Sequence, residues 1–260
     1  MEDLEKVINY FSNKLRTFGA THKGVDYNST EAQERRFSEL IRIIDPSRQY
    51  SLLDFGSGYG AMYDYLIRLG HQISYIGYDI AEPMVLEGQK LHPDDPNCIF
   101  TANIDEVPVV DYAVLSGTFN MKLNADDDDW TELVLSCLGQ MNDHAAKGFA
   151  FNMLTKYSDV EKMRPDLYYG DPCFFFDFCK YPHFFKKTHF CIQPPLYINF
   201  LVEGIVITTH FFILLGISGD SSVIDIRTAY AGKFFHIREN LDTAFLQNLL
   251  RDVSGSHYRG

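Results

Sequence analysis

YSLLDFGSGYG, residues 50–60, is the stretch around which the rest of the sequence is organised. A short apolar run ends in Asp54, and glycine then occupies the alternate positions Gly56, Gly58 and Gly60. This pattern predicts a strand that runs into a tight turn with a helix behind it. Glycines allow positive φ and let a ligand approach the backbone closely, while the helix directs its free N–H groups at the turn. The stretch therefore predicts a site for a nucleotide or nucleoside cofactor.

Strand and helix signals alternate from this turn onward. Strands are expected at residues 51–55, 73–78, 98–101, 112–116 and 149–154. Helices are expected at residues 61–69, 83–91, 126–141 and 172–180. Short connections between alternating strands and helices favour a Rossmann-like, doubly wound α/β fold with a mainly parallel sheet that is covered on both faces.

Two more helices are expected before the first strand. The first covers residues 4–18, where apolar side chains recur at helical spacing. The second begins at a capping box formed by Thr30 and Gln33 and stops before Pro46. A polar, glycine-bearing loop over residues 21–28 connects the two helices.

The pattern weakens after residue 181. It favours strands at residues 189–192, 200–207, 211–217 and 223–227, and a final helix from Asn240. The segment at residues 196–217 is long and apolar enough to suggest a membrane span. Glu203 and His210 would be costly in hydrocarbon, and Val, Ile and Phe dominate as they do in strands. Two buried strands are therefore favoured over a membrane span.

Composition narrows the function classes. The net charge of −12 and a pI of about 5.1 argue against a nucleic-acid partner, because such proteins present a basic face. The five cysteines show no C-x-x-C spacing, which favours free thiols in a reducing compartment. No signal-peptide pattern is recognised at the N-terminus, so a cytoplasmic location is expected. The four acids at residues 126–129 suit a helix N-terminus better than a metal site, and no metal is expected.

Two cofactor classes use a turn of this kind. Gly56, Gly58 and Ala61 fit the dinucleotide fingerprint G-x-G-x-x-A, which points to NAD. Asp54 would repel a pyrophosphate, but it can pair with a cationic amino group. Asp79 ends the next predicted strand, where a carboxylate can accept hydrogen bonds from both hydroxyls of a ribose. The two acids therefore favour a nucleoside with a positively charged amino acid tail over NAD.

These features resemble the class I S-adenosylmethionine-dependent methyltransferases, whose first motif is an apolar run followed by acid-x-Gly-x-Gly-x-Gly. The resemblance covers roughly residues 21–154 and implies S-adenosylmethionine as the cofactor and S-adenosylhomocysteine as its product. It implies cofactor contacts along the turn from Asp54, Phe55, Gly56, Ser57, Gly58, Tyr59 and Gly60. It further implies that Asp79 binds the ribose and that the adenine lies near Ile80, Met84, Asn103, Ile104 and Asp105. Ser116 and Gly117 would close the pocket beneath the sulfonium, and Gln33 and residues 21–28 would form a cap over the cofactor.

No catalytic residue is identified by the sequence. Attack on a sulfonium methyl is an in-line displacement, so positioning supplies much of the rate, and a base is needed only for a protonated nucleophile. Candidates on the open side of the sheet are Asn120, Tyr168, Tyr169 and Asp171, with Tyr157 and His144 as further possibilities. Tyrosines at such positions are equally often part of the core, and no pair of these residues has diagnostic spacing.

The resemblance also predicts the domain organisation. Residues 1–48 would form an N-terminal helical cap and residues 49–207 the methyltransferase domain, which would close with an antiparallel strand pair at residues 187–192 and 197–207. Residues 208–260 would form a C-terminal extension without a counterpart in the family. The expected activity is methyl transfer to an O or N atom of a small-molecule acceptor. An NAD-type oxidoreductase and a non-catalytic cofactor-binding module are the alternatives, and the sequence identifies neither the acceptor nor the oligomeric state.

Overall fold

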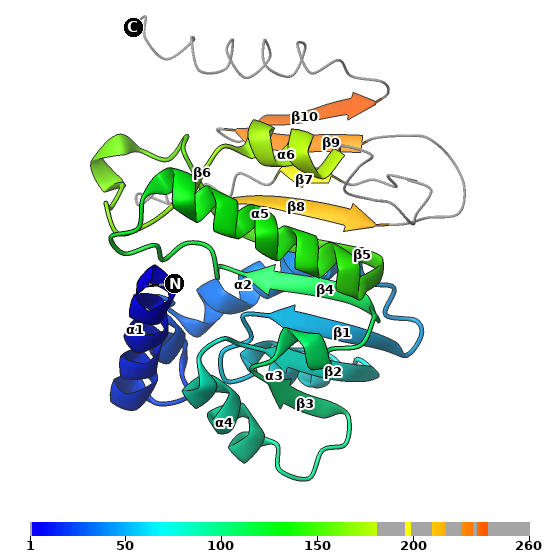
Figure 1. Cartoon of the computed structure of the whole chain (residues 1–260). Helices are drawn as coiled ribbons and strands as arrows, with labels where there is room; N and C mark the ends of the chain where they lie inside the picture. Colours follow the sequence, from blue (N-terminus) through cyan, green and yellow to red (C-terminus); the bar gives the residue numbers. More distant parts are fainter. Residues whose placement is uncertain (1, 181–195, 199–209, 217–224, 231–232, 239–260) are drawn as a thin grey trace, which may run out of the picture.

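The computed structural model describes residues 2–180, 196–198, 210–216, 225–230 and 233–238 (Figure 1). A seven-stranded sheet forms its centre, with the order β3-β2-β1-β4-β5-β6 and with β8 also paired to β5. Its strands are β1 (Tyr50–Phe55), β2 (Ile73–Tyr78), β3 (Cys98–Thr101), β4 (Val110–Ser116), β5 (Ala145–Thr155), β6 (Tyr169–Gly170) and β8 (His210–Gly216). β8 runs antiparallel to β5, and the other pairs are parallel.

The helices lie on both faces of this sheet, with α5 in front and α2 and α3 behind in Figure 1. They are α1 (Glu2–Phe18), α2 (Thr30–Leu40), α3 (Ala61–Arg68), α4 (Glu82–Leu91), α5 (Asp127–His144) and α6 (Pro172–Lys180). Single 3-10 turns occur at η1 (His22–Val25), η2 (Ile41–Ile43), η3 (Ile104–Glu106) and η4 (Val160–Lys162). The predicted mainly parallel α/β fold is confirmed.

Two hydrophobic clusters form the core, one on each face of the sheet. Successive side chains of a strand point to opposite faces. Leu52 accordingly packs with Met62 and Leu66 of α3, while Leu53 belongs to the cluster that contains Trp130 and Val134 of α5. Because β1 is covered on both faces, apolar side chains occupy consecutive positions of the strand at Leu52 and Leu53.

The helix ends follow from local chemistry. The Asp126 side chain caps α5 by accepting a hydrogen bond from the Asp128 amide, and acids fill the first turn, as predicted for residues 126–129. The predicted capping box at Thr30 is wrong. Ser29, one residue earlier, has extended backbone dihedrals, and its hydroxyl accepts a hydrogen bond from the Ala32 amide at 3.1 Å. Thr30 is therefore the first helical residue of α2.

Several C-terminal predictions fall outside the described residues. These are the strands at residues 189–192 and 200–207, most of the closing pair at residues 187–192 and 197–207, and the helix from Asn240. The strands expected at residues 211–217 and 223–227 correspond to β8 and β9 (Asp225–Tyr230). β9 pairs with β7 (Leu196–Ile198) and with β10 (Lys233–Arg238) in a separate sheet, and β10 was not predicted. Within the described residues, no helix is both long and apolar enough to cross a membrane.

Candidate functional site

The glycine turn between β1 and α3 is held against the end of β2. The amides of Gly56 and Ser57 donate hydrogen bonds to the Tyr78 carbonyl at 2.7 and 3.0 Å. Gly56 has a φ of 81°, and a Cβ there would lie 2.2 Å from the Thr118 hydroxyl oxygen. A side chain at Gly56 would therefore require both a strained backbone and displacement of Thr118.

Asp79 connects the turn to the start of α4. Its Oδ2 accepts a hydrogen bond from the Gly58 amide and its Oδ1 accepts one from the Ala81 amide, each at 2.8 Å. Burial raises the pKa of Asp79 to about 6, although the Ala81 and Gly58 hydrogen bonds act in the opposite direction. Each carboxylate oxygen has a further lone pair that can accept a bond from a ligand.

Asp54 is the most deeply buried acid of the site, at 3% exposure. Burial raises its pKa to about 7, and the Asp79 charge adds to this effect, whereas the hydrogen bond from Tyr75 lowers it. The structure shows no ion pair to Asp54 within its described residues. A buried carboxylate is costly unless a cation accompanies it, so a positively charged ligand group would stabilise Asp54 in its ionised form.

Both acids line one cavity of about 290 Å³ at the carboxyl ends of β1, β2 and β4, which we call the central cavity. The structure brings together most of the predicted cofactor residues around it. Those that line it are Gln33, Asp54, Phe55, Gly56, Ser57, Gly58, Asp79, Ile80, Met84, Ser116 and Gly117. The loop at residues 21–28, which the resemblance implies as a cap, lines it through Val25 and Tyr27. Sequence reasoning missed a group of lining residues from α1 and α5, among them Leu4, Ile8, Phe11, Trp130, Leu133 and Gln140.

Five predicted cofactor residues do not line the central cavity. Tyr59 and Gly60 complete the turn, where Gly60 is the N-cap residue of α3 with a φ of 94°. Asn103, Ile104 and Asp105 lie at η3, and the Asn103 side chain accepts a hydrogen bond from the Asp105 amide as the cap of that turn. Contact of η3 with an adenine ring therefore stays a prediction.

The candidate catalytic residues also lie outside the lining of the central cavity. Asn120 accepts a hydrogen bond from the Leu154 amide, and the Tyr168 hydroxyl is bonded to Thr131 at 2.7 Å. The other two candidates, Tyr169 and Asp171, form contacts that stabilise the segment before α6. The Tyr169 hydroxyl accepts a bond from the Arg164 amide, while Asp171 pairs with Lys156 and accepts from the Cys173 amide. These contacts account for the four residues as parts of the scaffold, and a catalytic role for them stays a prediction.

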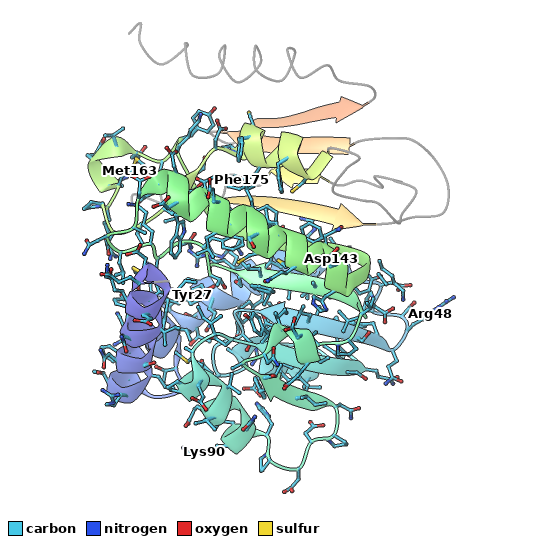
Figure 2. All side chains as sticks on the ribbon, viewed as in Figure 1. Tyr27, Arg48, Lys90, Asp143, Met163 and Phe175 are labelled. Carbon is cyan, nitrogen blue, oxygen red and sulfur yellow. The ribbon has the colours of Figure 1, made fainter. Side chains whose placement is uncertain are left out.

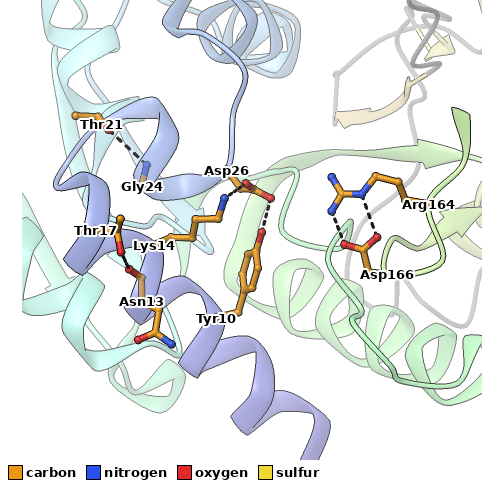
Figure 3. Close-up of polar contacts among 9 residues, drawn as sticks. All are labelled: Tyr10, Asn13, Lys14, Thr17, Thr21, Gly24, Asp26, Arg164 and Asp166. Carbon is orange, nitrogen blue, oxygen red and sulfur yellow. Dashed lines mark hydrogen bonds and ion pairs between the residues drawn. The ribbon is translucent and has the colours of Figure 1, made fainter.

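Tyr27, which is labelled in Figure 2, belongs to the loop before α2 and lines the central cavity. The Tyr27 hydroxyl donates to the Ser116 carbonyl at 3.1 Å and is 2.9 Å from the Ser116 hydroxyl. The loop is fastened to α1 at Asp26, which accepts bonds from the Tyr10 hydroxyl at 2.9 Å and the Lys14 ammonium at 2.6 Å (Figure 3). Residues on either side of the first strand thus close around the same cavity.

Comparison with known proteins identifies the family. A protein of Mycobacterium tuberculosis (strain ATCC 25618 / H37Rv) named "Putative methyltransferase Rv1506c" is 41% identical over 142 residues, which cover 54% of this chain and 84% of that protein. The chain belongs to the methyltransferase family. No protein-family model matches this methyltransferase.

A solved structure agrees with the fold of the methyltransferase. Magnesium protoporphyrin IX methyltransferase (ChlM) from Synechocystis PCC 6803 with bound SAH gives a TM-score of 0.51 at 12% identity, covering 72% of this chain and 83% of that chain. At this identity the likeness concerns the fold alone, which is the class I methyltransferase fold. Mycolic acid cyclopropane synthase CmaA1 complexed with SAH and CTAB gives a TM-score of 0.40 at 17% identity, and the match covers 50% of this chain and 46% of that chain. The methyltransferase therefore matches less than half the length of that synthase.

Proposed function

We propose that this methyltransferase binds S-adenosylmethionine in the central cavity and transfers its methyl group to an oxygen or nitrogen atom of a small-molecule acceptor. The observation that carries the proposal is the pair of carboxylates, Asp54 and Asp79, that end neighbouring strands and line one cavity. The burial of Asp54 without a cation among the described residues favours a ligand with an ammonium group. A dinucleotide would instead bring a pyrophosphate toward the same carboxylates.

Each part of the cofactor has a matching wall in the central cavity. The amino group of the methionine part would pair with Asp54, and the ribose hydroxyls would donate to Asp79. Ile80, Ala81 and Met84 provide an apolar surface for the adenine ring. Ser116 and Gly117, at the end of β4, would lie beneath the sulfonium.

The transfer needs positioning more than side-chain chemistry. Bound S-adenosylmethionine would supply an electrophilic methyl group: a lone pair of the acceptor would bond to the methyl carbon while the carbon–sulfur bond breaks and its electron pair stays on sulfur, which would leave S-adenosylhomocysteine. An acceptor hydroxyl or amine then releases its proton to water. The protein contributes by holding the nucleophile in line with the carbon–sulfur bond and by excluding water.

The chain's charge and cysteines support the remaining parts of the proposal. A net charge of −12 suits a small-molecule acceptor better than a nucleic acid. Cys98, Cys137, Cys173 and Cys179 are free thiols, which supports a cytoplasmic location.

The contacts of Tyr27 and α1 with the central cavity support the proposal that residues 1–48 cap the methyltransferase domain at residues 49–207. β8 adds a strand to the main sheet from within the proposed extension at residues 208–260.

Calorimetric titration of the full chain with S-adenosylhomocysteine tests the cofactor assignment. We expect the wild type to bind S-adenosylhomocysteine and Asp54→Asn and Asp79→Asn to lose most of this affinity. The control Asp94→Asn, which alters an exposed acid outside the central cavity, should bind as the wild type does. Folded wild-type protein that fails to bind would contradict the proposal, and binding of NAD⁺ instead would favour the oxidoreductase alternative.

Mass spectrometry of products from a panel of hydroxyl, amine and carbon acceptors tests the acceptor atom. Cofactor binding without any turnover would favour the non-catalytic module.

A further inference from the structure

The residues that the proposed cofactor must reach are almost inaccessible to solvent. Asp54, Ala81 and Met84 line the central cavity at 3%, 2% and 1% exposure. Lining side chains with so little exposure indicate a cavity that is nearly closed. One of its walls must therefore move whenever a molecule as large as a nucleoside enters or leaves.

The wall formed by residues 2–28, which we call the lid, is the least buried. The lid comprises α1, η1 and the residues that connect them to α2, and both α1 and the loop line the central cavity. Within the described residues 2–28, the buried ones are Val7 and Gly24. In β1, by contrast, all residues but one are buried. Segments with few buried contacts open at a low free energy, so the lid is the wall that can move.

Asp26 joins the two parts of the lid. Its backbone is left-handed, with a φ of 63°, and its carboxylate accepts hydrogen bonds from the Tyr10 hydroxyl and the Lys14 ammonium of α1 (Figure 3). A hydrogen bond between charged groups is stronger than a neutral one. We therefore expect the loop to move together with α1 as one unit.

Two contacts hold the lid over the end of the cavity that would bind the methionine part. A Cβ at Gly58 would lie 2.9 Å from Cγ1 of Val25, so Val25 rests against the glycine turn. The Tyr27 hydroxyl lies 3.1 Å from the Ser116 carbonyl oxygen and 2.9 Å from the Ser116 hydroxyl oxygen. Within the described part of the chain, no other hydrogen bond joins the lid to the central sheet. The apolar contact of Val25 has no preferred direction, so Tyr27 supplies the specific attachment.

We propose that the lid opens and closes over the cofactor and that the hydrogen bond between Tyr27 and Ser116 is its latch. The inference rests on the proposed function, because it concerns access to the same cavity. The latch breaks each time the lid opens, whether a ligand enters or leaves. Its removal should therefore raise the association and dissociation rate constants together and leave the dissociation constant nearly unchanged. A residue that only contacts the bound ligand would change the dissociation rate constant alone.

Stopped-flow fluorescence of the full chain, with S-adenosylhomocysteine as the probe, tests the latch. Trp130 is the single tryptophan of the sequence and lines the central cavity, so its emission reports binding. We expect Tyr27→Phe to raise both rate constants about two- to tenfold, as the loss of one hydrogen bond predicts, and to change the dissociation constant by less than about twofold. Tyr50→Phe is the matched control, because the Tyr50 hydroxyl bonds to His71 at the far end of β1. Its rate constants should equal those of the wild type.

Hydrogen exchange followed by mass spectrometry tests the extent of the lid. Amides of residues 2–28 should exchange faster in Tyr27→Phe than in the wild type, and they should exchange more slowly when S-adenosylhomocysteine saturates the wild type. Amides of β1 and β4 should exchange at the same rate in both proteins. Faster exchange across the whole chain would show a general loss of stability and would overturn the latch.

The outcomes separate this inference from the proposed function. If the wild type fails to bind S-adenosylhomocysteine, the cofactor site is contradicted, and hydrogen exchange of Tyr27→Phe still decides whether Tyr27 holds the lid. If S-adenosylhomocysteine binds but Tyr27→Phe leaves both rate constants unchanged, or raises the dissociation rate constant alone, the latch is overturned while the cofactor site stands. An increase in both rate constants, with faster exchange confined to residues 2–28, supports the inference.

Discussion

The Tyr75 hydroxyl of β2 donates a hydrogen bond to Oδ2 of Asp54 on the adjacent strand β1, at 2.6 Å. Both residues are buried, at 1% and 3% exposure. The bond fixes the orientation of the carboxylate and leaves Oδ1 available to accept a bond from a ligand. Burial raises the pKa of Asp54, and the hydrogen bond from Tyr75 lowers it, so the bond favours the ionised form of the carboxyl group.

Replacing Tyr75 by Phe should weaken cofactor binding in a way that depends on pH. Without the hydroxyl, the pKa of Asp54 rises further, so more of it is protonated at pH 7. We expect affinity for S-adenosylhomocysteine to fall about tenfold at pH 7, since a hydrogen bond to a charged group is worth about 1.5–3 kcal/mol. The loss should shrink at pH 9, as measured by calorimetry.

A matched control for this variant is Tyr50→Phe. Tyr50 is also a buried tyrosine, but its hydroxyl bonds to His71 at the opposite end of β1. We expect this variant to bind S-adenosylhomocysteine as the wild type does. A loss in Tyr75→Phe of equal size at pH 7 and pH 9 would show that Tyr75 acts through packing and not through the Asp54 charge.

The affinity for S-adenosylhomocysteine should fall as the pH is lowered. The ligand's ammonium group requires an ionised Asp54, and its ribose hydroxyls bind best to an ionised Asp79. The pKa values of Asp54 and Asp79 are about 7 and about 6. Below the pKa of Asp54 the dissociation constant should rise about tenfold per pH unit, and more steeply once Asp79 is also protonated. Binding at pH 6 should then release protons, which calorimetry in buffers of different ionisation enthalpy measures. An affinity that is constant from pH 8 to pH 5 is incompatible with the assigned roles.

The stability of the free protein should show the opposite dependence on Asp54. Its pKa is raised in the folded state, so its favourable contribution is complete below about pH 4 and is lost as the pH rises toward 7. Asp54→Asn lacks this dependence. Relative to the wild type, we expect this variant to gain stability by at most about 1.4 kcal/mol per pH unit from pH 4.5 to pH 7. Urea denaturation across this range measures the difference, and a constant difference would contradict the raised pKa.

The elements around the first strand could be predicted because their signals are local. β2 and β3 begin and end where the sequence predicts, since each is an apolar run bounded by turn residues. α6 has the predicted bounds for the same kind of reason. The start of α2 was misplaced by one residue because Ser29 and Thr30 can both cap a helix, and only the backbone at Ser29 distinguishes them.

The site could be predicted only as far as its motif extends. Asp54, the glycine turn and Asp79 lie at the ends of consecutive strands, so their proximity follows from a parallel sheet. The apolar wall from α1 and α5 depends on how distant helices pack, which periodicity does not determine. The bond from Tyr75 to Asp54 depends on the register in which Asp54 is paired with Gly77, with Tyr75 two residues before it. That register was the missing information.

Gly88 supplies a test of the packing behind the turn. In a helix interior, Gly→Ala normally stabilises by about 1 kcal/mol. In α4, a Cβ at Gly88 would lie 2.6–2.8 Å from ring atoms of Phe100, a buried residue of β3 that also lies against Gly60 and Gly77. We therefore expect Gly88→Ala to destabilise the protein by about 1–3 kcal/mol in urea denaturation, as overpacking does. Phe100→Leu should cost less in the Gly88→Ala background than in the wild type, because the smaller side chain relieves the contact. A stabilised Gly88→Ala variant would mean that Phe100 can move away from α4, and that the glycine turn does not depend on its position.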